Sequence, residues 1–224
     1  MILGAKPAVF VSPGQLILAS GSPRRREMLR LLGLDFIVRV SEVDERVRPA
    51  ERPAAFVKRV GREKAMAVAG SNAGAWILAA DTAVVINGQI LGKPANAAEA
   101  LVMLKKLAGG SHEVWTGFCL IKQQENIRLC RAVRTVVRFV DWHEDIFSAY
   151  VNSGDSLDKA GGYGIQGAGG VLVRGISGSY SNVVGLPMAE VMAAMLRLGA
   201  VCPEAANPSL PGNASPDSQD RHRG

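Results

Sequence analysis

The chain has few of the side chains that build metal centres and disulfide frameworks. Its 224 residues include 3 cysteines and 3 histidines. Cys119, Cys130 and Cys202 are widely spaced in apolar surroundings, so we expect reduced thiols and neither disulfides nor thiolate metal ligands. His112 and His143 are isolated in the sequence, which argues against a zinc site or a catalytic triad and favours structural roles.

Aromatic residues and long apolar runs are also scarce. Aromatics make up 5% of the chain, and none interleaves with its basic cluster. A stacking platform for single-stranded nucleic acid is therefore poorly supported, although the net charge of +6 favours polyanionic ligands in general. No apolar run reaches the length of a membrane span, and the N-terminus lacks the features of a secretory signal. We expect a cytoplasmic protein without a membrane partner.

The rest of the composition indicates one globular domain with two appendages. Hydrophobic residues make up 48% of the chain, enough to bury a full core. Two prolines and two glycines precede the first convincing strand, so residues 1–14 are predicted to be a loosely held leader. Residues 203–224 are rich in Pro, Asn, Ser and charge, and they are predicted to be a disordered tail. The body of the protein is then residues 15–202.

Helices and strands alternate along this body, which predicts an α/β protein with a mixed sheet flanked by helices. Apolar periodicity predicts helices at 23–32, 53–69, 97–107, 144–151 and 187–198. Strands are expected at 16–18, 76–80, 114–122, 127–139 and 171–176. Residues 84–91 are predicted to form a hairpin, because Asn87-Gly88 favours a type I′ turn.

The segment Leu16–Arg26, LILASGSPRRR, has the pattern of an anion site. Its apolar residues predict a short buried strand, and Pro23 suits the first turn of the helix that follows. Free N–H groups at the helix N-terminus, the helix dipole and the side chains of Arg24, Arg25 and Arg26 would together attract phosphate. The alternative is a capped surface helix whose arginines are only solvated.

Four more polar residues flank apolar elements: Glu45, Lys64, Asp81 and Lys93. Asp81 is predicted to end a buried strand, where the open side of an α/β sheet gathers its ligand groups. Lys93 directly follows the hairpin, whereas Lys64 lies on a helix and by itself is typical of a solvated lysine. As a set, the two carboxylates can hold a magnesium ion, and the lysines can neutralise a polyphosphate.

A second glycine-rich segment, residues 158–170, contains a GxGxxG spacing. A dinucleotide-binding fingerprint needs a strand before it and a helix after it, and this segment has neither, so we reject that interpretation. We expect a loop whose backbone approaches a ligand, with Lys159 as a cation and Gln166 as an amide that both donates and accepts hydrogen bonds. The alternative is a glycine-rich surface turn.

Taken in order, seven motifs of the chain resemble one family. They are SGSPRRREML, VDE, REKA, ADT, GKP, DKAGGYGIQG and SGSYSNVVGLP, and they extend over about residues 15–200. The set is similar to the Maf proteins, nucleoside triphosphate pyrophosphatases first associated with septum formation. This resemblance implies a two-lobed α/β fold with a curved mixed sheet and a deep nucleotide-binding groove, like the inosine triphosphate pyrophosphatases. It also implies hydrolysis between the α and β phosphates. With the paired carboxylates, it leads us to expect a divalent cation, Mg²⁺ or alternatively Mn²⁺.

The resemblance assigns roles to individual residues. Asp81 matches the family's proposed general base. The other catalytic polar residues of the family are matched by Glu45, Lys64 and Lys93, and its phosphate-binding loop is matched by Ser20, Ser22, Arg24 and Arg25. Asp81 could instead be a metal ligand together with Glu45, and the sequence does not separate these two roles.

Three positions associated with base choice in the family carry Arg24, Thr82 and Gln166 here. This is the pattern of the branch that acts on dTTP and UTP, whereas the 7-methyl-GTP branch has an aromatic residue, a Gln and a Glu. A Gln amide can accept from N3–H of uracil or thymine and donate to a carbonyl of the same base. Departures are minor: Gly162 stands where alanine is common, and Arg26 occupies a variable position.

A binding protein is the competing hypothesis. In it, a basic groove grips nucleic acid or a cell-division partner, and any hydrolysis is incidental. The low aromatic content does not favour nucleic acid as the ligand. A homodimer is compatible with the sequence, which does not specify an oligomeric state.

Overall fold

A mixed sheet organises the fold. The computed structural model of the protein describes residues 9–204. Within them, a seven-stranded sheet has the order β3-β2-β4-β6-β7-β8, with β5 paired to β4. Its centre consists of three long antiparallel strands: β4 (Trp76–Ile86), β6 (Ser111–Lys122) and β7 (Ile127–Phe139). The shorter strands are β2 (Leu16–Leu18) and β3 (Ile37–Val38), which are parallel to β4, and β5 (Gln89–Leu91) and β8 (Val173–Ser177), which are antiparallel to their neighbours.

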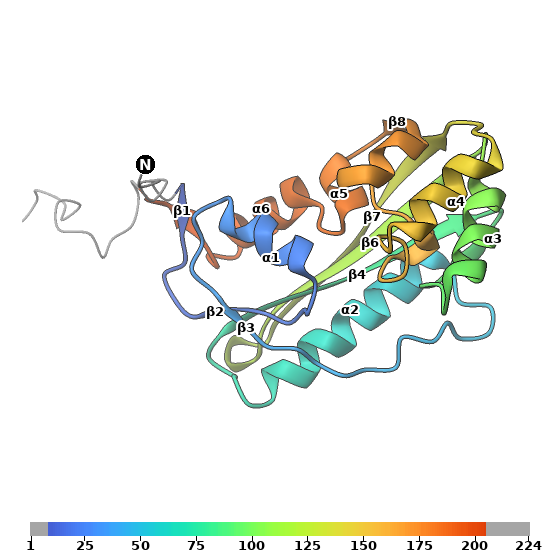
Figure 1. Ribbon diagram of the computed structural model, residues 1–224. Helices are drawn as coiled ribbons and strands as arrows, with labels where there is room; N and C mark the ends of the chain where they lie inside the picture. Colours follow the sequence, from blue (N-terminus) through green and yellow to red (C-terminus); the bar gives the residue numbers. More distant parts are fainter. Residues whose placement is uncertain (1–8, 205–224) are drawn as a thin grey trace, which may run out of the picture.

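Helices cover both faces of this sheet (Figure 1). One face packs against α2 (Pro53–Ala69). The opposite face carries two hydrophobic cores. One lies under α1 (Pro23–Arg30) and α6 (Met188–Arg197), and the other lies under α3 (Ala97–Leu107) and α4 (Glu144–Asn152). The short helix α5 (Tyr180–Val184) contacts β6 and β7 on this same face. The predicted α/β class, with a mixed sheet flanked by helices, is confirmed.

Side chains alternate between the two faces along β4. Leu78 and Ala80 belong to the core under α1 and α6, whereas Ile77 and Ala79 pack with α2. By the same alternation, Asp81 faces α2, and the next residue, Thr82, faces the opposite helical layer.

One edge of β4 is uncovered in its middle. β2 pairs with β4 as far as Leu78, whose carbonyl accepts a hydrogen bond from the N–H of Ala19 at 2.8 Å. β5 pairs with the same edge only from Val84 onward. Among residues 9–204, no strand pairs with this edge between those two points. Side chains from both faces of β4 can therefore reach one opening at residues 79–83.

Several elements have the predicted bounds. The helices at 53–69 and 97–107 and the strand at 127–139 are confirmed to the residue. In the predicted hairpin turn, Asn87 and Gly88 have φ values of 49° and 77°, as a type I′ turn requires.

Three strand predictions were wrong at their ends, and one of them, the strand predicted at 114–122, begins three residues earlier at Ser111. The strand predicted at 76–80 continues to Ile86, so Asp81 lies inside a strand and does not end one. Its polar side chain does not interrupt the strand, because β6 pairs with the other edge of β4 from Ile77 through Val85. The strand predicted at 171–176 begins only at Val173, because the two preceding residues belong to a 3₁₀ helix, η3 (Gly167–Leu172).

The expectation of reduced thiols was wrong for two of the three cysteines. Cys119 and Cys130 form a disulfide, and Cys202 is free. The register of β6 and β7 places Cys119 directly opposite Cys130, with Cα atoms 4.1 Å apart. Spacing in the sequence does not reveal this pair, because the register is set by the whole hairpin.

A small second sheet joins the two ends of the described chain. β1 (Phe10–Val11), inside the predicted leader, pairs antiparallel with β9 (Cys202–Pro203). Most of the two predicted appendages, namely residues 1–8 and 205–224, lies outside the described residues. No helix within residues 9–204 combines the length and the apolar composition needed to cross a membrane.

The contact between α2 and β6 depends on Gly117. A Cβ atom at this position would overlap the carbonyl group of Val57 and lie 2.7 Å from the backbone nitrogen of Lys58. We predict that Gly117→Ala lowers the free energy of unfolding by about 3 kcal/mol, because α2 must move away from the sheet. Urea denaturation measures this change.

Gly70→Ala is the matched control. Gly70 has a helical φ of −56°, and no atom would lie within 4 Å of its Cβ. Its replacement is expected to be neutral or slightly stabilising. Equal stability of the two variants would show that the packing of α2 does not require glycine at position 117.

Candidate active site

A groove of about 700 Å³ opens at the uncovered edge of β4. Its walls include the turn between β2 and α1, the chain before α2, α2 itself, the β4–β5 hairpin, the glycine-rich loop and the end of α5. The groove is lined by every site residue predicted from the sequence: Ser20, Ser22, Arg24, Arg25, Glu45, Lys64, Asp81, Thr82, Lys93, Lys159 and Gln166. The fold therefore brings together residues that the motifs of the sequence grouped but could not place in space.

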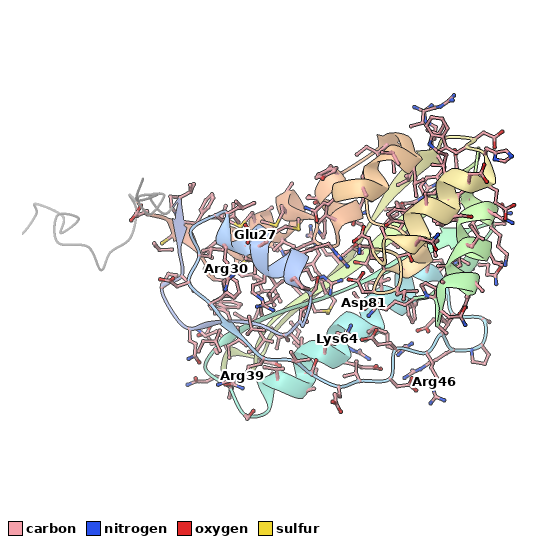
Figure 2. All side chains as sticks on the ribbon, in the orientation of Figure 1. Glu27, Arg30, Arg39, Arg46, Lys64 and Asp81 are labelled. Atoms are coloured by element: carbon pink, nitrogen blue, oxygen red, sulfur yellow. A yellow bond between two sulfur atoms is a disulfide. The ribbon has the colours of Figure 1, made fainter. Side chains whose placement is uncertain are left out.

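Lys64 stands between two carboxylates. Its Nζ lies 2.8 Å from Oδ1 of Asp81 and 2.7 Å from Oε1 of Glu45. Figure 2 shows Lys64 on α2 and Asp81 on β4 directed toward each other. Lys64 and Asp81 are only 8% and 7% exposed, whereas the Glu45 side chain is about half exposed. Among the described residues, the second oxygen of each carboxylate has no protein partner, and so it can bind a ligand.

The cations of the groove control the ionisation of Glu45. Burial raises the pKa of Glu45, but the hydrogen bond and charge of Lys64 lower it, as do the charges of Lys93 and Arg25. The net result is a pKa below the ordinary value. Glu45 is therefore a carboxylate at neutral pH, the form that can bind a cation.

The carboxylate pair suits a hard divalent cation. Mg²⁺ prefers oxygen ligands, and one or two protein carboxylates commonly hold it together with water and substrate phosphates. In the part of the chain that the structure describes, no group of three His, Cys, Asp or Glu side chains could hold an ion by itself. Glu45 and Asp81 therefore fit a cation that completes its coordination with an anionic ligand.

Arg25 is buried on the other face of β4. Its guanidinium donates to Oγ of Ser20 at 3.1 Å, to Oγ1 of Thr82 at 3.0 Å and to the carbonyl of Gly185 at 2.7 Å. Burial lowers the pKa of Arg25, while the carboxylate of Asp81 opposes this change. A guanidinium has five N–H groups, so two have no partner among the described residues and can donate to an anion.

The predicted turn from strand to helix is confirmed. Ser22 caps α1, and its Oγ accepts a hydrogen bond from the N–H of Arg25 at 3.5 Å. Pro23 occupies the first turn, as expected. Ser22, Pro23 and Arg24 all line the groove, so the N-terminus of α1 is part of its wall.

Two of the basic side chains predicted to bind the ligand, Lys159 and Arg24, are paired with acidic residues. Nζ of Lys159 donates to the carbonyl and Oδ1 of Asp155 and to Oδ1 of Asp158, at 2.5 to 2.7 Å. These bonds use all three of its N–H groups. Nη1 of Arg24 pairs with the other oxygen of Asp158 at 3.2 Å. Asp158 thus joins α1 to the glycine-rich loop, and a bound anion would compete with it for Arg24.

Among the site residues predicted from the sequence, Lys93 and Gln166 have polar side chains without a side-chain partner in the described part of the chain. Both are exposed where they line the groove, and within residues 9–204 neither forms a hydrogen bond or an ion pair with another side chain. Both are therefore free to bind a ligand.

A chain of hydrogen bonds supports Thr82, and the sequence did not reveal it. Oγ1 of Thr82 lies 2.9 Å from Oγ1 of Thr116, which donates to the carbonyl of Asn182 at 3.0 Å. Because Arg25 can only donate and a carbonyl can only accept, the bonds run from Arg25 through both threonines to Asn182. Thr116 lies opposite Thr82 through the register of β4 and β6, which no local motif signals.

His112 anchors the glycine-rich loop from the sheet. Its Nε2 lies 2.7 Å from the hydroxyl of Tyr163, and both side chains are buried. Tyr163 lines the groove between Lys159 and Gln166. Burial lowers the pKa of His112 to about 4, so its ring is neutral at pH 7.

Comparison with known proteins identifies the family. The pattern of the family described as "Maf-like protein" matches residues 15–198. The chain belongs to the Maf family. Three relatives of this Maf protein are each described as a dTTP/UTP pyrophosphatase. The one from Geobacter sulfurreducens is 46% identical, over 84% of this chain and 98% of the relative. The one from Desulfotalea psychrophila is 50% identical, over 81% and 93%. The one from Myxococcus xanthus is 47% identical, over 86% and 96%.

Two solved structures align with part of this Maf protein. A HAM1 protein from Coxiella burnetii matches 57% of this chain and 74% of its own, with a TM-score of 0.41 and 19% identity. The Ham1 protein of Staphylococcus aureus matches 57% of this chain and 73% of its own, with a TM-score of 0.43 and 12% identity.

Stability is predicted to depend on pH through His112. An ordinary histidine in an unfolded chain takes up a proton below about pH 6.5, whereas the folded ring stays neutral down to about pH 4. Between these values the unfolded state binds more protons. The free energy of unfolding therefore falls as the pH is lowered through this window, by about 2–3 kcal/mol from this residue.

The variant His112→Leu separates this effect from other titrations. It lacks both the titrating ring and the bond to Tyr163, so it is expected to be less stable near neutral pH and to lose less stability on acidification. Urea unfolding at about pH 7 and about pH 5 gives the difference. Parallel pH profiles of the variant and the wild type would contradict the prediction.

Proposed function

We propose that this protein hydrolyses nucleoside triphosphates to nucleoside monophosphates and pyrophosphate, with dTTP and UTP as preferred substrates. Relatives of 45–50% identity described as dTTP/UTP pyrophosphatases support the reaction and the substrates. The observation that carries the proposal is the cluster of Glu45, Lys64 and Asp81, which lies in one groove with Arg24, Arg25 and Lys93. Paired carboxylates next to concentrated positive charge suit the cleavage of a polyphosphate.

Asp81 is the general base of this mechanism. A water molecule beside Oδ2 of Asp81 gives a proton to that oxygen while the water oxygen bonds to the α-phosphorus. The bond from the α-phosphorus to the bridging oxygen breaks, and pyrophosphate leaves with the electron pair. In the free enzyme, Lys64 holds the other oxygen of Asp81 at 2.8 Å and so fixes the direction of the carboxylate.

Positive charge stabilises the leaving pyrophosphate. Lys93 carries an ammonium without a partner among the described side chains, and Arg25 has two N–H groups left for phosphate oxygens. The first turn of α1 adds the positive end of its dipole. These groups act on charge that increases as the phosphoanhydride bond breaks, which is where electrostatic stabilisation lowers a barrier.

A divalent cation, Mg²⁺ or alternatively Mn²⁺, is part of the proposal, with Glu45 and Asp81 as its protein ligands. When bound, such a cation neutralises phosphate charge and polarises phosphorus–oxygen bonds. We assign the protein to the cytoplasm, where nucleoside triphosphates are used.

Base selection is assigned chiefly to Gln166. Its amide has no partner among the described side chains, so it can donate to a carbonyl and accept from N3–H of uracil or thymine. The hydroxyl of Thr82 accepts from Arg25 and donates to Thr116, so its hydrogen is already used. Thr82 therefore contributes by orienting Arg25, and Arg24 contributes once a ligand has replaced Asp158.

The variant Asp81→Asn tests the general base. It keeps an oxygen that can accept from Lys64 but cannot take up a proton, so we expect kcat to fall by about 10²–10⁴-fold with nucleotide affinity little changed. Pyrophosphate release from dTTP and calorimetry with a non-hydrolysable analogue measure the two quantities. The control is Asp44→Asn, an exposed carboxylate paired with Arg46 outside the groove. Near-normal turnover of Asp81→Asn would remove Asp81 from its role.

A panel of nucleoside triphosphates tests the substrate. With Mg²⁺ fixed, dTTP and UTP are expected to have the highest kcat/KM and to release pyrophosphate. Gln166→Glu should lower both values by roughly tenfold or more, because a carboxylate cannot donate to a pyrimidine carbonyl. Gln123→Glu, an exposed position outside the groove, is the control. Release of inorganic phosphate alone, or 7-methyl-GTP as the best substrate, would overturn the proposal.

A further inference from the structure

We propose that Lys64 occupies the place of the divalent cation between Glu45 and Asp81, so that lysine and cation exclude each other. This inference rests on the proposed function, which supplies the cation. It has a specific consequence: the free protein binds a divalent cation weakly, and the cation site forms when a triphosphate draws Lys64 away.

The geometry around Nζ is that of a bound cation. The ammonium lies 2.7 and 2.8 Å from one oxygen of each carboxylate, at the point where their negative charges converge. Mg²⁺ binds carboxylate oxygens at about 2.0–2.1 Å, closer than an ammonium does, so an ion that used both of these oxygens would need the space between them that Nζ occupies. The two positive charges cannot share that position.

Burial strengthens the exclusion. Lys64 and Asp81 are each less than 10% exposed, so little water separates or screens charges at this point. The net charge of the cluster also favours replacement of the ammonium by a divalent cation. Glu45, Asp81 and an ammonium sum to −1, whereas the carboxylates with a divalent ion sum to zero. In the free protein, Lys64 therefore reduces the repulsion between the carboxylates and keeps them together.

A triphosphate gives Lys64 another place to bind. The lysine side chain is a flexible four-carbon stem with a compact charge, and phosphate oxygens in the groove are strong acceptors for its ammonium. Lys64 itself lines the groove, so its Nζ can move to phosphate without a change in α2. The cation that accompanies the nucleotide then takes both carboxylate oxygens and holds Asp81 in place of Lys64.

Binding of Mn²⁺ to the protein without nucleotide tests this inference. Lys64→Met keeps the length of the side chain and removes its charge, and we expect it to bind Mn²⁺ at least tenfold more tightly than the wild type. Electron paramagnetic resonance or calorimetry measures the affinity, and circular dichroism checks the fold. Lys93→Met is the matched control. It removes one positive charge from the groove that does not pair with either carboxylate, and we expect its affinity to rise less than threefold.

Several results would overturn the inference. One is that Lys64→Met binds Mn²⁺ no more tightly than the wild type does. This is expected if the cation binds the second oxygen of each carboxylate while Lys64 stays in place. Another is an equal gain in Lys93→Met, which would reflect general electrostatics. If Lys64→Met does not fold, a crystal structure of the wild type saturated with Mn²⁺ decides: Nζ is expected to leave both carboxylates, and its retention there beside the metal would refute exclusion.

The proposed function and this inference are tested by different experiments. Absence of dTTP hydrolysis by the wild type would count against the enzyme, whereas the Mn²⁺ titration uses neither nucleotide nor turnover. Stronger Mn²⁺ binding by Lys64→Met would therefore establish the exclusion even if the substrate were a different polyphosphate.

Discussion

The uncovered edge of β4 is the constraint on which the site depends. A strand alternates its side chains between two faces, so Asp81 and Thr82 would ordinarily be separated by the sheet itself. Here β2 leaves this edge after Leu78 and β5 joins it only at Val84. Within the described chain, the interval between them stays open, and groups from both helical layers can meet one ligand there. The groove is thus a property of strand pairing as much as of its polar residues.

The two faces contribute different chemistry. On the side of α2, a lysine holds two carboxylates, one buried and one half exposed. On the opposite side, Arg25 begins a line of hydrogen bonds that ends at a main-chain carbonyl. In the first arrangement, the two carboxylates can bind either Lys64 or, as proposed above, a divalent cation. The second holds a guanidinium in place with three hydrogen bonds from the protein itself. The proposed reaction uses both.

Much of the fold could be predicted from the sequence, because periodicity and turn chemistry are local, and the motifs named residues that the structure places along one groove. The helix at 53–69 and the Asn87-Gly88 turn followed from residues near each other in the chain. Long-range register was not accessible in the same way, and this explains the two largest errors. The disulfide between Cys119 and Cys130 depends on the pairing of β6 with β7. Likewise, a charged residue after an apolar run suggested a strand end at Asp81, where pairing with β6 in fact continues.

The pairing of β1 with β9 brings Val11 opposite Cys202. The sheet that contains the groove is a separate one, with no strand in common. For residues 9–204, two neighbouring end segments are the usual condition for circular permutation, because a short linker can join them without distorting the body. The order in which the elements of this protein are connected is therefore open to redesign, with new ends placed at the exposed turn between β6 and β7 while β4 and its open edge remain intact.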